Sequence, residues 1–189
     1  MKKIISICLV LMASVSFTLK ENKTSYSGHW VSEATENLGN GTWGVRDFNI
    51  GDKEWQIKFT MYFDSAKKIP VFTFRGVGNY DITAKSAKVA GAEEATFNFA
   101  KKYVTLHISD TSVIKKFGFA ACNLKGNLEK DITSTGCSFL TSQSTCGQEY
   151  DLVAIKKNRL FLGQRPADGN MCSKEKRPTS LGSALVRAR

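Results

Sequence analysis

The stretch from Glu54 to Phe63 reads Glu-Trp-Gln-Ile-Lys-Phe-Thr-Met-Tyr-Phe, with an apolar side chain at every second position. This alternation predicts a β-strand with one buried and one exposed face, because successive side chains of a strand point to opposite sides. A helix would scatter the same side chains around its circumference. The expected buried face carries Trp55, Ile57, Phe59, Met61 and Phe63.

The same period of two recurs along most of the chain. Further strands are expected within residues 28–34, 42–50, 69–80, 96–99, 103–108, 152–155 and 160–162. Gly76 and Gly78 indicate a bend or a close approach of another backbone. The polar residues 156–158 predict a hairpin, and Asp110 or Ser112 is expected to begin one helical turn. About eight to ten short strands predict an all-β antiparallel sandwich or barrel in one domain, residues 25–189.

The N-terminus is expected to be a targeting segment. Two lysines precede a short apolar run and then small residues, which predicts a signal peptide over residues 1–16 and a linker over 17–24. Cleavage there would leave 25 basic and 17 acidic residues, a net charge of about +8. The protein is therefore expected to be secreted, into the periplasm or the extracellular space.

Four cysteines remain after cleavage, and an even number in an exported chain predicts two disulfides. These are Cys122, Cys137, Cys146 and Cys172, and three pairings are open. A zinc site is disfavoured because there is no C-x-x-C motif and both histidines lie far from the cysteines in sequence. No metal and no other cofactor is expected.

Catalytic motifs are missing from the sequence. There is no phosphate-binding loop, no G-x-S-x-G and no H-E-x-x-H, so a non-enzymatic role is expected. A hydrolase built on His107 or Asp131 is a weaker hypothesis, and Asp131 and Asp168 could form a carboxylate pair. Nucleic acid is not an expected partner, because the aromatic residues share faces with aliphatic ones. The positive net charge would keep the protein soluble, or would attract it to an acidic polymer or an anionic lipid surface.

The apolar strand faces permit two interpretations. A closed barrel of about eight strands either fills its interior or leaves room for one small ligand, and alternation does not distinguish the two. The residues expected to form the interior wall are Trp55, Ile57, Phe59, Met61, Phe63, Phe72, Phe74, Phe97 and Phe99.

Several segments resemble one known family. Residues 163–169 read Gly-Gln-Arg-Pro-Ala-Asp-Gly, followed by Glu-Lys-Arg at 175–177 and Thr-Ser at 179–180. These resemble the G-Q-R-P-S-D-G and E-K-R-x-T-S segments of the APCDD domain family (adenomatosis polyposis coli down-regulated). Residues 131–137 resemble that family's D-V-T-x-x-x-G-C, and residues 28–36 resemble its start. The motif residues are Trp30, Glu36, Arg46, Gln164, Arg165, Pro166, Asp168 and Gly169.

The resemblance implies a lipocalin-like antiparallel barrel with an apolar cavity for a lipid or acyl group. It also implies that Cys122 pairs with Cys137, which leaves Cys146 for Cys172. Thr35 and Lys67 stand where the family has two cysteines, as if one family disulfide were lost. The loop at 164–169 would close or brace one end of the barrel, with Arg165 as a partner for a carboxylate.

The resulting hypothesis is a secreted, monomeric, non-enzymatic protein that binds a lipid or acylated ligand in its barrel. The alternative is a basic interaction module with a solid core that binds an acidic polymer, a membrane surface or a protein partner. Salt would discriminate between them, because surface binding weakens with ionic strength.

Overall fold

The computed structural model describes residues 25–189, so the expected signal peptide (1–16) and linker (17–24) lie outside the described residues. The described chain forms one sheet with two short helical segments and one six-residue helix, α1 (Thr111–Lys116). The 3-10 segments are η1 (Phe119–Cys122) and η2 (Lys174–Lys176). The strands are β1 (Gly28–Ser32), β2 (Glu36–Gly39), β3 (Thr42–Ile50), β4 (Glu54–Tyr62), β5 (Pro70–Lys85), β6 (Glu93–Leu106), β7 (Glu129–Asp131), β8 (Gln148–Lys156), β9 (Arg159–Gly163) and β10 (Leu181–Arg187).

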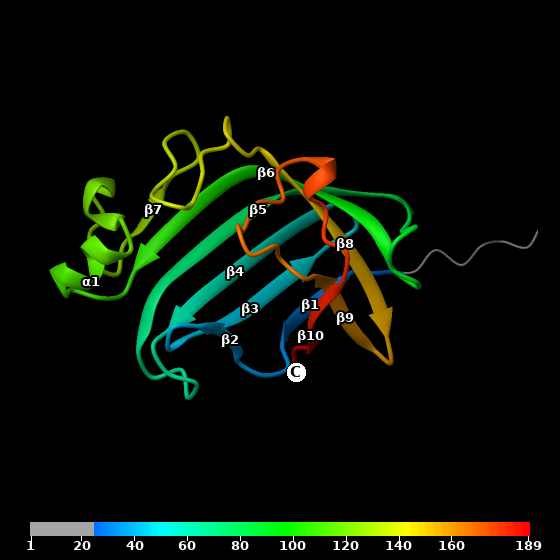
Figure 1. The fold of residues 1–189 in the computed structure, drawn as a ribbon, viewed down its shortest axis with the longest axis horizontal. Coiled ribbons are helices and arrows are strands. Elements are labelled where there is room, and N and C mark those ends of the chain that lie inside the picture. The colour runs from blue at the N-terminus through cyan, green and yellow to red at the C-terminus, as the bar shows by residue number, and fades with distance from the viewer. Residues whose placement is uncertain (1–24) are drawn as a thin grey trace, which may run out of the picture.

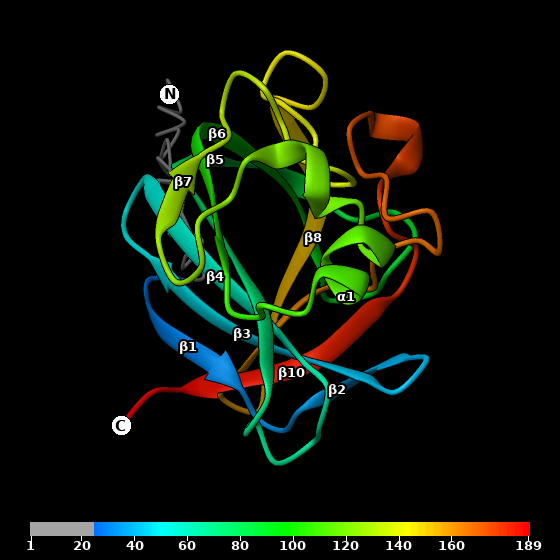
Figure 2. The ribbon, with the colours of Figure 1, turned by 90° about the vertical axis from the view of Figure 1, so that its left-hand side faces the viewer.

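Eight of the strands close into a barrel. Their order is β1-β10-β9-β8-β6-β5-β4-β3, and β1 pairs back onto β3 to complete the circle. Every pairing is antiparallel; β2 adds to β3, and β7 adds to β6. Figure 1 shows the long strands β3 to β6 side by side, and Figure 2 shows the strands arranged around a ring. The predicted all-β antiparallel barrel is confirmed.

Strand β4 lies where its alternation predicts. It pairs with β3 along its whole length and with β5 on its other edge. The glycine prediction is also confirmed: a Cβ atom on Gly78 would lie 1.8 Å from the carbonyl oxygen of Asn98 on β6. A Cβ on Gly76 would lie 2.7 Å from the ring of Phe99. Both glycines therefore let β6 and its side chains approach β5 closely.

A β-bulge in β6 joins two segments that the sequence predicts as separate strands. Val77 pairs with Lys101 and the next residue, Gly78, pairs with Phe99, so Ala100 has no partner on β5. An extra residue in one strand reverses which positions face inward beyond it. The buried residues of β6 change accordingly, from Phe97 and Phe99 to positions 102, 104 and 106.

Two apolar clusters fill parts of the barrel. The first includes Trp30, whose indole nitrogen donates to the carbonyl of Tyr26 and whose ring lies under the guanidinium of Arg187. The second lies beside α1 and η1 and includes Phe119 and Cys137, the latter bonded to Cys122. The implied pairing of the cysteines is confirmed at both disulfides.

Three strands were not anticipated by the sequence analysis: the short β2 and β7, and β10. Of these, β10 belongs to the closed barrel. Only Leu185 is fully buried within it, so its sequence carries little apolar alternation. It nevertheless completes the barrel between β1 and β9.

Two local predictions are confirmed: Asp110 caps α1 with its side chain, and the hairpin turn between β8 and β9 is made at 157–158. Among the described residues, no helix is both long and apolar enough to cross a membrane.

Candidate binding cavity

The barrel encloses a cavity of about 750 Å³. Its walls come from β2 to β6 and β8 to β10, and from the loops at 139–146 and 164–172. It touches both apolar clusters, because Phe48 and Trp55 belong to the first and Phe72 to the second. Proteins typically bind small apolar ligands in cavities of ~300–1,000 Å³. The barrel is therefore hollow on the scale of one such ligand.

Seven of the nine predicted wall residues line this cavity. They are Trp55, Ile57, Phe59, Phe72, Phe74, Phe97 and Phe99. Met61 and Phe63 do not line it. They pack against the second cluster, where the rings of Phe63 and Phe117 lie 6.2 Å apart. Met61 and Phe63, at the C-terminal end of the alternating stretch, therefore pack into the second cluster. Trp55, Ile57 and Phe59, nearer its N-terminal end, line the cavity.

The aromatic rings of the wall contact one another edge to face. The ring centroid of Trp55 lies 5.2 Å from that of Phe97 and 5.1 Å from that of Phe99. Phe74 lies 6.2 Å from Phe99 on the next strand. Aromatic pairs in this geometry contribute about 0.5–1.5 kcal/mol each beyond their buried area, so these contacts stabilise the wall.

Exposed lining residues mark the mouth of the cavity. Leu38 on β2 is 42% exposed and Phe139 is 54% exposed, although both line the cavity. The rings of Phe139 and Phe72 lie 5.7 Å apart, so the apolar wall continues outward to the surface. Apolar side chains therefore lie at the mouth of the cavity as well as inside it.

The loop after β9 covers another side of the cavity, as the motif at 164–169 implies. Arg165 donates two hydrogen bonds to Glu149 on β8, at 2.9 and 2.7 Å, and a third to the carbonyl of Gly169 at 2.8 Å. The carboxylate partner expected for Arg165 is therefore a residue of the protein itself. Asp168 pairs with Lys176 at 2.7 Å. These contacts brace the loop against the barrel.

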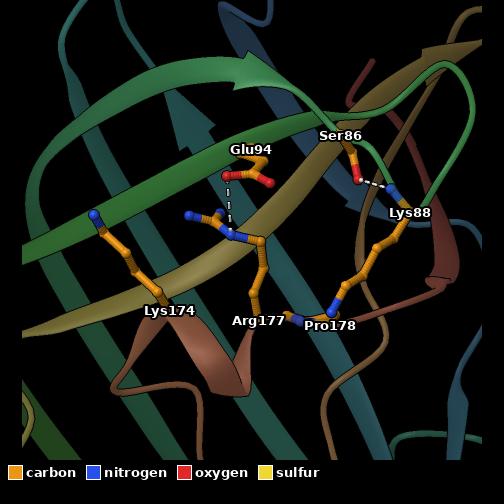
Figure 3. A pocket seen from close by; sticks show the side chains of 6 residues that line it. All are labelled: Ser86, Lys88, Glu94, Lys174, Arg177 and Pro178. Atoms are coloured by element: carbon orange, nitrogen blue, oxygen red, sulfur yellow. Dashed lines mark hydrogen bonds and ion pairs between the residues drawn. The ribbon is translucent and has the colours of Figure 1, made fainter.

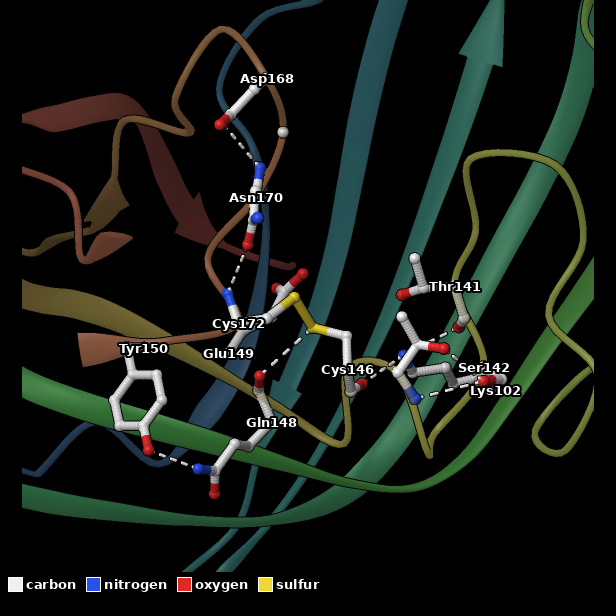
Figure 4. The surroundings of a disulfide bond; sticks show 12 residues. Lys102, Thr141, Ser142, Cys146, Gln148, Glu149, Tyr150, Asp168, Asn170 and Cys172 are labelled. Atoms are coloured by element: carbon white, nitrogen blue, oxygen red, sulfur yellow. Dashed lines mark hydrogen bonds between the residues drawn. A yellow bond between two sulfur atoms is a disulfide. The ribbon is translucent and has the colours of Figure 1, made fainter. Parts of the chain in front are cut away.

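The disulfide between Cys146 and Cys172 ties this loop to the segment before β8 (Figure 4). The Cα atoms lie 5.3 Å apart, and both residues line the cavity. Asn170 accepts a hydrogen bond from the backbone of Cys172 and extends the brace. The disulfide thereby joins two loop segments that both line the cavity.

The cavity also contains charged groups that the sequence analysis missed. Lys102 is only 3% exposed; its ammonium donates to the carbonyls of Thr141, at 3.0 Å, and Cys146, at 2.6 Å. Asp151 is 7% exposed, and burial raises the pKa of its carboxyl to about 6. The sequence held one usable signal for Lys102: the apolar residues of β6 move from odd to even positions after Phe99, which indicates a bulge.

Two other motif residues, Glu36 on β2 and Arg46 on β3, form an ion pair at the cavity wall. Arg46 forms a two-pronged ion pair with Glu36, with distances of 2.8 and 3.0 Å. Ser32 donates to the same carboxylate at 3.0 Å. Arg46 also donates to the carbonyl of Ser183 at 3.3 Å, so the pair joins β2, β3 and β10. Both charges are satisfied within the protein.

His107 and Asp131, on which the weaker hydrolase hypothesis rests, do not line the cavity, whereas Asp168 does. Thr73 and Asn127 make hydrogen bonds to the ring nitrogens of His107, at 2.9 and 3.2 Å. Asp131 pairs with Lys101 at 3.0 Å, whereas Asp168 pairs with a different lysine on the loop after β9. His107, Asp131 and Asp168 thus each have different partners. The two carboxylates pair with different lysines and do not share a partner.

A smaller hollow of about 230 Å³ lies elsewhere on the molecule (Figure 3). Apart from Pro178, its lining is polar or charged, and Arg177 lies 3.5 Å from Glu94 there. Arg177 also donates to the carbonyls of Ala95 and Asp151, which anchors the segment after η2. The hollow lacks the apolar wall of the barrel cavity.

Within residues 25–189, no group of three or more His, Cys, Asp or Glu side chains could hold a metal ion. The two disulfides are consistent with an extracellular location. Neither a model of a known protein family nor a curated protein sequence matches this chain.

Proposed function

We propose that this chain is a secreted, non-enzymatic binding protein that takes up a lipid or fatty acyl chain in its barrel. The observation that carries the proposal is the cavity of about 750 Å³ with aromatic walls. Each methylene transferred from water into such a site contributes about 0.8 kcal/mol. The resemblance of residues 163–169 to the APCDD domain supports the same ligand class.

The alternative is a basic interaction module with a solid core, and the cavity of about 750 Å³ supports the lipid-binding function in preference to it. Its ligands would be held by the surface charge, which is +10 for the whole chain. Attraction between exposed charges is screened over about 8 Å at physiological salt. Binding through the surface should therefore weaken steeply as salt is added, whereas acyl binding inside the barrel should not.

The test is direct uptake of a hydrophobic ligand. Protein purified from its source is examined by native mass spectrometry and then extracted for lipid. Delipidated protein is titrated with a fluorescent fatty acid at low and high salt, and palmitic acid is used as competitor. The proposal expects saturable binding of one ligand per chain that resists salt. Absence of any bound lipid, together with no uptake in vitro, would overturn it.

A matched pair of variants on β4 locates the binding. Ile57 lines the cavity, and its neighbour Gln56 points to the opposite face of the strand. Ile57→Trp places an indole inside the cavity, and Gln56→Trp places the same group outside. We expect Ile57→Trp to weaken palmitic acid more than decanoic acid and Gln56→Trp to change neither. Equal effects of both variants would place the ligand outside the barrel.

A further inference from the structure

Lys102 is a buried cation inside an otherwise aromatic section of the cavity. The bulge at Ala100 turns its side chain inward, whereas the neighbouring Lys101 points outward and pairs with Asp131 at 3.0 Å. Lys102 is 3% exposed, and its nitrogen lies 4.3 Å from the centre of the Phe99 ring. Lysine is almost never this buried unless its charge is paired.

The partners of Lys102 are neutral. Two of the three N–H donors of its ammonium bond the carbonyls of Thr141 and Cys146 (Figure 4). No carboxylate of residues 25–189 forms an ion pair with it. Glu149 is the acidic residue whose field reaches Lys102, but Arg165 already holds both of its carboxylate oxygens. The ammonium is therefore positioned by carbonyl groups and lacks a counter-anion.

Burial lowers the pKa of Lys102, and the field of Arg165 acts in the same direction. A ligand anion beside the ammonium would reverse this effect, because an opposite charge favours the ionised form. All four of Phe99, Lys102, Thr141 and Cys146 line the cavity. A ligand that enters the cavity can therefore reach the one donor that remains.

We propose that Lys102 binds the carboxylate of the ligand, so that the cavity selects a free fatty acid or another long-chain monocarboxylate. This inference rests on the proposed function and adds the chemistry of the head group. The acyl tail would lie against Phe99, Phe97 and Phe74. One free N–H suits one oxygen of a singly charged head group. A phosphate, with more charge and more acceptor oxygens, would need further donors and would be repelled by Glu149 more strongly than a singly charged carboxylate.

The experiment compares palmitic acid with hexadecanol, which has the same chain and no charge. Both are titrated into the delipidated, disulfide-bonded protein and into Lys102→Met, with Lys101→Met as the matched control. The wild type and Lys101→Met should bind the acid about ten- to a hundredfold more tightly than the alcohol, the range for a hydrogen bond between charged groups. Lys102→Met should lose this preference and keep its affinity for the alcohol.

A purely structural Lys102, which only holds the loop at 141–146, would give a different pattern. Its substitution would weaken the acid and the alcohol by the same factor. Lys102→Arg keeps the charge and should retain the preference for the acid, which separates loss of charge from loss of folding. A wild type without preference, or a Lys102→Met variant that retains it, would overturn the inference and leave acyl binding intact. Failure of both ligands to bind would overturn the proposed function and this inference with it.

Discussion

Asp151→Asn should change how the stability of this protein depends on pH. The side-chain oxygen Oδ1 of Asp151 accepts hydrogen bonds from the backbone N–H groups of Leu152 and Gly163, at 2.7 and 2.8 Å. Asparagine offers the same acceptor without a titrating proton. The substitution therefore keeps these contacts and removes the ionisation.

The sign of the effect follows from the direction of the pKa change. Burial, the largest cause, raises the folded pKa from the ordinary 3.8 to about 6, although both backbone hydrogen bonds and Arg165 oppose it. Between these values the folded protein keeps a proton that the unfolded chain releases. Stability from this group is therefore greatest below the unfolded pKa and falls as pH rises toward about 6. One pKa unit corresponds to about 1.4 kcal/mol, so the loss is about 3 kcal/mol.

The assay is urea unfolding of delipidated wild type and Asp151→Asn, followed by far-ultraviolet circular dichroism from about pH 3 to about pH 7. The informative quantity is the difference between the two free energies of unfolding, because all other groups titrate alike in both. As pH rises through this range, the free energy of unfolding of the variant should increase by about 3 kcal/mol relative to that of the wild type. A difference that stays constant with pH would refute the argument. A constant offset from the new amide group would not affect it.

Two further substitutions test the framework of the cavity. Gly78→Ala should destabilise the fold by several kcal/mol in thermal unfolding, because its Cβ would lie 1.8 Å from the Asn98 oxygen. The control Gly126→Ala should be tolerated, because there is open space around Gly126. Equal melting temperatures of the two variants would contradict the close approach at Gly78. Replacing Cys146 and Cys172 together by serine opens a loop with a sequence separation of 26, which should cost about 3 kcal/mol in urea unfolding and speed ligand release in stopped-flow measurements. An unchanged release rate would show that the loop after β9 does not retain the ligand.

Local regularities in the sequence were enough to predict much of the fold. The alternation from Trp55 to Phe63 predicted a strand with one buried face, and the residues at 156–158 predicted the hairpin between β8 and β9. These features depend on neighbours in sequence, where side-chain direction follows directly from backbone period. The four cysteines likewise predicted two disulfides, while their pairing came from the resemblance at the motif segments.

The charged interior required the tertiary structure. Glu149 and Asp151 lie on β8, where the consecutive residues Leu152, Val153 and Ala154 are all buried. Both faces of the strand therefore carry apolar residues, and the inward face cannot be identified from the period. Lys102 faces inward only because Ala100 forms a bulge against β5. Strand β10 buries only Leu185 fully, and its apolar residues 184–186 are consecutive rather than alternating, so its place in the barrel follows from its pairing with β1 and β9.

The sequence alone therefore determined that this chain forms an antiparallel β-structure with one apolar face per strand, because that property is local. Whether those faces meet in a solid core or surround a hollow was decided only by the tertiary structure. The size of the space left inside depends on barrel closure, on the bulge in β6, and on how far the rings of Trp55, Phe97 and Phe99 reach across it. Barrel closure and the reach of the rings are set by residues that are distant in sequence, and alternation along one strand carries no information about them.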